Sequence, residues 1–180
     1  MKPLPLAYAW LDDMSGLPSM IREARKLFGT LETPGPADNP VILAWANEVG
    51  LAKSYSDDAI PWCGLFAAVV ANRANWTPVD APLWARNWAK FGRAVDQADA
   101  AIGDVLVFVR DGGGHVGFYV GEDAGYFHVL GGNQSDAVTI TRIAKSRCIA
   151  VRRPIWRSAQ PLGVVKKVLK ASGAVSANEA

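Results

Sequence analysis

The sequence predicts a single α+β domain, in which a helical first half is followed by a sheet of about five largely antiparallel strands. Apolar residues repeat with the period of a helix up to about residue 91, and from residue 105 onward the period changes to two. The connections between the strand-like runs are too short for parallel crossovers, which need about a dozen residues or more. Half of the 180 residues are hydrophobic, which is enough for a core without disulfide or metal support.

Three helices and a further helical stretch are predicted in the first half. Asn39-Pro40 begins the second helix, because Asn caps a helix and Pro fits its first turn. A third helix starts around Cys63 and runs to about residue 75, and another lies near Pro82–Phe91. The apolar stripes of the first three are Met20, Ile21, Ala24, Leu27 and Phe28, then Ile42, Trp45, Ala46 and Val49, then Cys63, Phe66, Ala67 and Val70.

Five short strands separated by Gly- or Asp-rich turns are predicted in the second half. They are Val105–Val109, His115–Val120, Tyr126–Leu130, Val138–Ile143 and Cys148–Arg152. The single folded domain is expected to span residues 1–157. Residues 158–180 are expected to form a tail, with one amphipathic helix over Leu162–Leu169 and a loose end over Ser172–Ala180.

Composition excludes several classes of protein. The formal net charge is only +2, so the dense basic surface of a nucleic-acid-binding protein is missing. The longest apolar stretch, Leu65–Ala71, is too short to span a membrane, and the N-terminal residues lack the apolar core of a secretory signal peptide. Without an export signal, Cys63 and Cys148 are expected to be free thiols, in a protein made in a cytoplasm.

Cys63 is the first candidate for chemistry. It lies in the first turn of a predicted helix, where unpaired N–H groups and the helix dipole favour a thiolate. The same N–H groups can bind an oxyanion. The alternative is a small core hydrophobe, because Cys63 also lies on the apolar stripe of its helix.

The chain has two histidines that could act as a base. His115 follows three glycines and opens a strand, so there is space for a substrate backbone beside its ring. His128 alternates with apolar residues in the next strand, which favours a structural role. Either residue could also be an ordinary strand histidine.

The run Leu130-Gly131-Gly132-Asn133-Gln134 is the third candidate. An amide oxygen there can accept the N–H of an imidazole and fix its tautomer, which is the orienting role in a Cys-His-polar triad. The alternative is an ordinary hairpin turn, because Gly and Asn are common turn residues.

Together these motifs resemble the NlpC/P60 and CHAP superfamily of peptidoglycan hydrolases, whose fold is papain-like, and most of all its phage lysin branch. The resemblance covers about residues 17–156 and rests on Pro61-Trp62-Cys63-Gly64-Leu65-Phe66, Gly103-Asp104-Val105, Gly114-His115-Val116-Gly117-Phe118 and Leu130-Gly131-Gly132-Asn133-Gln134. It implies that Cys63 is the nucleophile, His115 the base and Asn133 the orienting residue. His128 and Gln134 are rivals of Asn133 for the third role.

The sequence departs from the family pattern in two places. CHAP proteins often carry a Glu just before the orienting Asn, but Gly131 and Gly132 stand there. Some members bind calcium through spaced Asp residues, whereas Asp57 and Asp58 are adjacent, so no metal is expected. A zinc site would combine the two cysteines with the two histidines, which lack the short spacing of zinc ligands. No cofactor is expected.

The resemblance implies a hydrolase that cleaves an amide of the cell-wall peptide, as an endopeptidase or an N-acetylmuramoyl-L-alanine amidase. A phage or prophage endolysin is expected, a monomer whose partner is bacterial peptidoglycan, kept in the host cytoplasm until its release to the wall. Trp62, Tyr55 and Gln134 are expected to bind substrate, with Trp84 and Trp88 as further groove residues. The alternatives are a non-catalytic wall-associated or virion module, and an acyltransferase or deamidase with the same triad.

Overall fold

A seven-stranded sheet forms the centre of the computed structural model, which describes residues 1–35 and 37–176. The strand order is β1-β6-β2-β3-β4-β5-β7, and every neighbouring pair is antiparallel except β5 and β7. The strands are β1 (Arg93–Val95), β2 (Val105–Arg110), β3 (Gly113–Glu122), β4 (Tyr126–Gly131), β5 (Thr139–Ala144), β6 (Cys148–Arg153) and β7 (Val175–Ser176).

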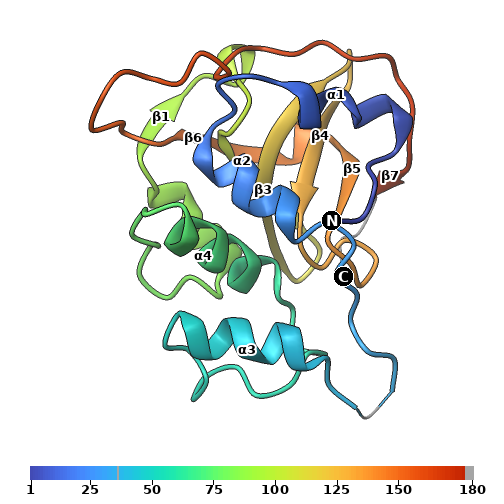
Figure 1. Ribbon diagram of the computed structural model, residues 1–180, viewed down its shortest axis with the longest axis vertical. Helices are drawn as coiled ribbons and strands as arrows, with labels where there is room; N and C mark the ends of the chain where they lie inside the picture. The colour runs from blue at the N-terminus through green and yellow to red at the C-terminus, as the bar shows by residue number, and fades with distance from the viewer. Residues whose placement is uncertain (36, 177–180) are drawn as a thin grey trace.

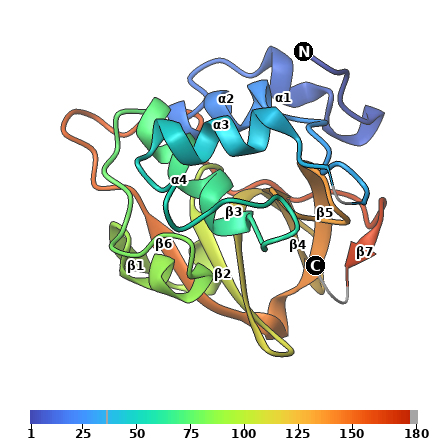
Figure 2. The same cartoon turned by 90° about the horizontal axis from the view of Figure 1, so that it is seen from below.

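The α-helices lie together on one side of this sheet, as the two views in Figures 1 and 2 show. Helix α4 packs against α2, α3 and β3, so it links the helical layer to the sheet. The helices are α1 (Trp10–Asp13), α2 (Ser19–Lys26), α3 (Pro40–Glu48) and α4 (Cys63–Arg73), with short 3-10 helices η1 (Leu6–Tyr8), η2 (Ala85–Lys90), η3 (Gln97–Asp99) and η4 (Lys145–Arg147).

The predicted α+β class is confirmed, as are the three main helices and the five strands. The Asn39 side chain accepts a hydrogen bond from the Val41 N–H at 2.8 Å, which is the cap that the Asn39-Pro40 pair predicts. The stretch near Pro82–Phe91 forms a 3-10 helix, η2. The short edge strands β1 and β7 are additional to the prediction.

The predicted helix over Leu162–Leu169 is wrong. This segment begins with a turn at residues 162–163, contains no helix, and uses its backbone groups on other parts of the chain: Gly163 N–H donates to Gly16 O at 3.0 Å, and Val165 O accepts from Ile102 N–H at 3.0 Å. A helix would have to give up these bonds. The tail then passes over one end of the sheet to β7, which pairs with β5 (Figure 1).

The expected loose end over Ser172–Ala180 is wrong for residues 175–176, which form β7, and residues 177–180 lie outside the described part of the chain. Within the described residues, no helix is long and apolar enough to cross a membrane.

Candidate functional site

Cys63 is the first residue of α4, as the sequence predicts. The helix can start close to a neighbouring loop because the next residue is Gly64: a Cβ there would lie 2.3 Å from Pro82 O and 2.6 Å from Leu83 O. This close approach brings Leu83 and Trp84 to the side of Cys63. The first backbone N–H groups of α4 have no acceptor within the helix and can donate hydrogen bonds to an anion.

The thiol of Cys63 is buried, and burial raises its pKa. Several groups oppose this effect: the backbone N–H of Val116, the positive charge of Arg110, and the N–H groups of Gly64 and Cys63 itself. The thiol is therefore protonated at rest in an environment that contains donors for a thiolate. The Val116 contact also places the sulfur beside β3, at the residue that follows His115.

His115 lies near the start of β3 with only 1% of its surface exposed. Its Nε2 is 3.1 Å from Oε1 of Gln134, in the turn after β4. Its ring also packs against Phe108, the residue opposite it on β2, with 6.4 Å between ring centroids. The strand pairing and this hydrogen bond together hold the imidazole in one orientation.

The orientation of the Gln134 amide is determined by its own partners. Its Nε2 donates to Thr139 O at 2.7 Å and to Val129 O at 3.2 Å, and carbonyl oxygens can only accept. Oε1 therefore faces the ring of His115, where it must accept a hydrogen bond from Nε2–H. The neutral imidazole then carries its proton on Nε2, and Nδ1 is the basic nitrogen.

The amide that contacts His115 is therefore that of Gln134, whereas the sequence predicts this contact for Asn133. Asn133 has φ 55°, and Ser135 and Asp136 in the same turn also have positive φ. Asn tolerates this left-handed conformation better than most residues, so backbone geometry explains Asn133. The turn then directs the next side chain, Gln134, toward the histidine.

The two glycines that replace the CHAP Glu have a steric explanation. A Cβ at Gly131 would lie 2.7 Å from Gln134 Oε1 and 3.2 Å from His115 Nε2. A Cβ at Gly132 would lie 2.6 Å from Cβ of Phe66. Neither position can therefore carry an acidic side chain without displacing the histidine, its amide partner or the α4 helix.

An open groove of about 460 Å³ leads to Cys63. Its wall includes Trp84, which is 74% exposed, and Arg110, the last residue of β2. The described residues that line it are Ser54, Ile60, Pro61, Cys63, Leu83, Trp84, Ala85, Arg110, Gly112, Gly113 and Gly114. Arg110 is the single charged residue of this lining.

Trp62 and Tyr55 do not line the groove, which corrects their predicted role in substrate binding. Trp62 is fully buried, and its Nε1 donates to Oε2 of Glu32 at 3.0 Å. Tyr55 is 1% exposed, and its hydroxyl donates to Ile60 O at 3.2 Å. Trp88 is also buried, with Nε1 bonded to Pro82 O. Of the three tryptophans predicted to line the groove, only Trp84 is exposed.

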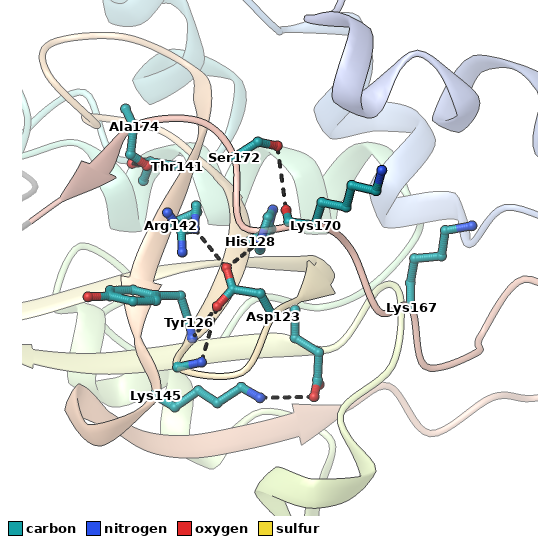
Figure 3. Close-up of polar contacts among 12 residues, drawn as sticks. Asp123, Tyr126, His128, Thr141, Arg142, Lys145, Lys167, Lys170, Ser172 and Ala174 are labelled. Atoms are coloured by element: carbon teal, nitrogen blue, oxygen red, sulfur yellow. Dashed lines mark hydrogen bonds and ion pairs between the residues drawn. The ribbon is translucent and has the colours of Figure 1, made fainter.

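The second histidine, His128, belongs to a different network inside the protein. Its Nδ1 lies 2.7 Å from the Tyr8 hydroxyl, and its Nε2 lies 3.0 Å from Oδ2 of Asp123. The same carboxylate accepts from Nε of Arg142 at 2.7 Å, and Figure 3 shows it between His128 and Arg142. Both nitrogens of His128 are occupied, so it is not a rival for the site at Cys63.

Potential metal ligands gather elsewhere. Among the described residues, the one group of three that could share an ion is Asp38, Asp57 and Asp58. Asp58 Oδ2 already accepts the N–H groups of Thr33 and Asn39, and Asp38 accepts the N–H of Asp58. These bonds fasten two loops together. The combination of both cysteines and both histidines that a zinc site would need is not brought together, and the cysteines are free thiols as predicted.

Compared with known proteins, the chain matches no family model and no curated protein.

Proposed function

We propose that the protein is a cysteine hydrolase that cleaves an amide bond of the peptide part of bacterial peptidoglycan. The geometry of Cys63, His115 and Gln134 supports covalent catalysis. The resemblance of the surrounding motifs to NlpC/P60 and CHAP hydrolases supports a cell-wall substrate, in a phage-type lysin with a papain-like fold that waits in the host cytoplasm.

The observation that carries the proposal is the hydrogen bond between His115 and Gln134. An amide whose NH₂ is held by two carbonyls fixes the Nε2–H tautomer, so Nδ1 keeps a lone pair that can take a proton. A histidine with only a structural role does not need this arrangement next to a cysteine at a helix start.

In the first half-reaction, Nδ1 of His115 takes the thiol proton and the sulfur of Cys63 attacks the scissile carbonyl carbon. The carbonyl oxygen becomes an oxyanion, which the free N–H groups at the start of α4 stabilise. When the C–N bond breaks, His115 returns the proton to the leaving amine. The acyl group stays on sulfur as a thioester.

In the second half-reaction, a water molecule gives a proton to His115 and its oxygen attacks the thioester. The C–S bond breaks, the product leaves as a carboxylic acid, and the thiol is restored. Because burial raises the pKa of Cys63, this route starts from a neutral thiol rather than from a preformed ion pair.

Digestion of purified peptidoglycan followed by mass spectrometry tests the proposal. Free lactyl groups with released peptides would indicate an amidase, and shortened stems or opened cross-links would indicate an endopeptidase. Cys63→Ala should lower the rate at least about 10³-fold with an unchanged circular dichroism spectrum. An undigested wall with the wild-type protein, or full activity of Cys63→Ala, would contradict the proposal and favour a non-catalytic wall or virion module.

A further inference from the structure

A second groove, of about 390 Å³, lies beside the loop that follows α4 (residues 74–84, green in Figure 1). Its wall contains a half-buried tryptophan, Trp76, whose ring makes edge-to-face contacts with Phe91 and Trp156, at 6.3 and 5.2 Å between ring centroids. Ile155, which is 61% exposed, adds further apolar surface. A fixed aromatic ring beside exposed apolar surface suits a ligand that has an apolar face of its own.

The polar side chains around this groove are not used elsewhere in the fold. Within the described residues, none of them makes a hydrogen bond or an ion pair through its side chain. They supply an amide, a hydroxyl, a carboxylate and two cations, from Asn75, Thr77, Asp80, Lys90 and Arg157. The groove of about 580 Å³ beside β1 differs in this respect, because its Arg153 and Lys166 are paired with Asp104 and Glu122. The groove at Trp76 therefore combines an apolar surface with donors and acceptors that a ligand can use.

We propose that this groove binds an N-acetylated sugar of the glycan strand and so holds the strand that carries the stem peptide to be cleaved. The inference rests on the proposed function, because it names a further part of the same substrate. A sugar ring has a face of C–H groups that stacks on an aromatic side chain, and a rim of hydroxyl and amide groups that needs donors and acceptors of both kinds. A wall polyanion fits less well, because Asp80 places a negative charge among the cations.

The location of the groove supports this assignment, because one loop borders both grooves. Residues 75–80 line the groove at Trp76, whereas Leu83 and Trp84 line the groove at Cys63. Asp80 and Leu83 are three residues apart, so their Cα atoms are separated by at most about 11 Å. A glycan strand bound at Asp80 therefore keeps its own stem peptide near the groove at Cys63.

The loop between the two grooves is held in a fixed position by η2. Nδ2 of Asn87 donates to Asp80 O at 3.2 Å and to Ala81 O at 3.1 Å, and Nε1 of Trp88 donates to Pro82 O at 2.9 Å. The spacing of the two grooves is thus set before a substrate binds, which lowers the entropy cost of binding a two-part substrate.

The first test is binding, which does not depend on turnover. Calorimetry should show that chitotetraose, the linear tetramer of N-acetylglucosamine, binds the wild type, and that an Asp80→Ala/Arg157→Ala double variant raises its Kd at least about 10-fold. The matched control is Asp13→Ala, which removes an exposed aspartate of α1 outside the groove and should bind as the wild type does.

Three results of this test would overturn the inference. The first is no binding of chitotetraose to the wild type, and the second is equal Kd values for the double variant and Asp13→Ala. The third is binding of glycerol phosphate oligomers in place of chitotetraose, with affinity lost at high salt, which would identify the ligand as a polyanion.

The second test compares an N-lactoyl stem peptide with the same peptide carried on its N-acetylglucosamine–N-acetylmuramic acid disaccharide. The wild type should cleave the disaccharide-linked peptide with a kcat/KM about 10- to 100-fold higher, because sugar binding adds to the stabilisation of the transition state. The double variant should bring this ratio close to one, and Asp13→Ala should keep it. A ratio that the double variant leaves unchanged would overturn the inference. If the wild type cleaves neither substrate, the proposed function fails, whereas chitotetraose binding that only the double variant loses would still support the sugar groove.

Discussion

The two histidines occupy neighbouring strands and are equally buried, yet their partners differ. His115 on β3 faces an amide oxygen through one nitrogen, and that amide is neutral. His128 on β4 has a phenol on one nitrogen and a carboxylate on the other, and the carboxylate also binds Arg142 (Figure 3). The first arrangement fixes which ring nitrogen carries the proton, and the second uses both nitrogens to join parts of the fold.

The networks also differ in what they connect. The Tyr8–His128–Asp123 chain ties the N-terminal 3-10 helix η1 to the β3–β4 turn, and Arg142 extends it to β5. The His115–Gln134 pair connects the start of β3 to a turn beside the groove. Burial and residue type therefore do not distinguish the two histidines, whereas the charge of the partners described for each of them does.

The largest difference is expected from matched alanine substitutions at the two histidines. His115→Ala should lower peptidoglycan hydrolysis by about 10³-fold or more, because it removes the proposed base, and it should cost about 1–3 kcal/mol because Oε1 of Gln134 loses this buried partner. His128→Ala should keep a kcat close to wild type per folded molecule but cost about 2–4 kcal/mol, because it removes the buried ring and the partner that the Tyr8 hydroxyl has in this network, and takes one donor from Asp123. The loss of activity is measured by the hydrolysis rates of both variants, and the loss of stability by their unfolding in urea.

Two outcomes would contradict the roles assigned to the two histidines. A folded His128→Ala protein without activity would place His128 in the catalytic machinery. An active His115→Ala protein would remove the base from the proposed mechanism.

A second contrast lies within one turn, between Gln134 and Asn133. Gln134→Ala should lower kcat by about 10- to 10³-fold, because it removes the group that fixes the tautomer of His115 without touching substrate. Asn133→Gly should be nearly neutral, because glycine adopts the left-handed conformation at no steric cost. The pH profile of kcat should shift only in Gln134→Ala. A large activity loss in Asn133→Gly with a normal profile in Gln134→Ala would return the orienting role to Asn133.

Much of the fold follows from the sequence because its signals are local. The 3.6-residue stripes and the Asn39-Pro40 cap predict helices that the structure contains, and alternation predicts five of the seven strands. The tail is different. Residues 162–169 have an amphipathic pattern, but their backbone groups bind Gly16, Ile102 and Glu122, and no local pattern reports such distant partners.

The site shows the same division between local and distant information. The position of Cys63 at a helix start is local and could be predicted. The choice between Asn133 and Gln134 depends on which of two adjacent side chains a left-handed turn directs inward, and this is a property of backbone dihedral angles. The Asn-Gln order and the two glycines before it were signals of a special turn, but they do not specify its direction.

The His128 network should also make stability depend on pH. Burial lowers the pKa of His128 below its usual 6.5, so the folded protein resists the proton that the unfolded chain accepts. Stability is therefore full above pH 6.5 and falls as the pH drops below that value. Burial would raise the pKa of Asp123, but hydrogen bonds from Arg142 and His128 outweigh burial and lower this pKa to about 2. Protonation of Asp123 therefore causes a second loss of folding stability between about pH 4 and 2.

Urea unfolding of the wild type and His128→Asn at pH 7.5, 6 and 5 measures the first effect. His115 is common to both proteins, so its titration cancels in the difference. The wild type should lose more stability than the variant between pH 7.5 and 5. Parallel curves for the two proteins would show that His128 does not take part in this dependence.

The smallest effect is expected at Cys148, which extends the comparison from histidines to thiols. Cys148 is half-buried at the start of β6, its Sγ contacts Ala150 O at 3.4 Å, and burial raises its pKa to about 11. Unlike Cys63, it has no helix start beside it and does not line the groove. Cys148→Ala should therefore cost about 1 kcal/mol in urea unfolding and leave hydrolysis unchanged. Iodoacetamide should then inactivate wild type and Cys148→Ala at the same rate, with Cys63 as the site of inactivation. If the Cys148→Ala variant resisted inactivation by iodoacetamide, the thiol required for activity would be Cys148 and not Cys63.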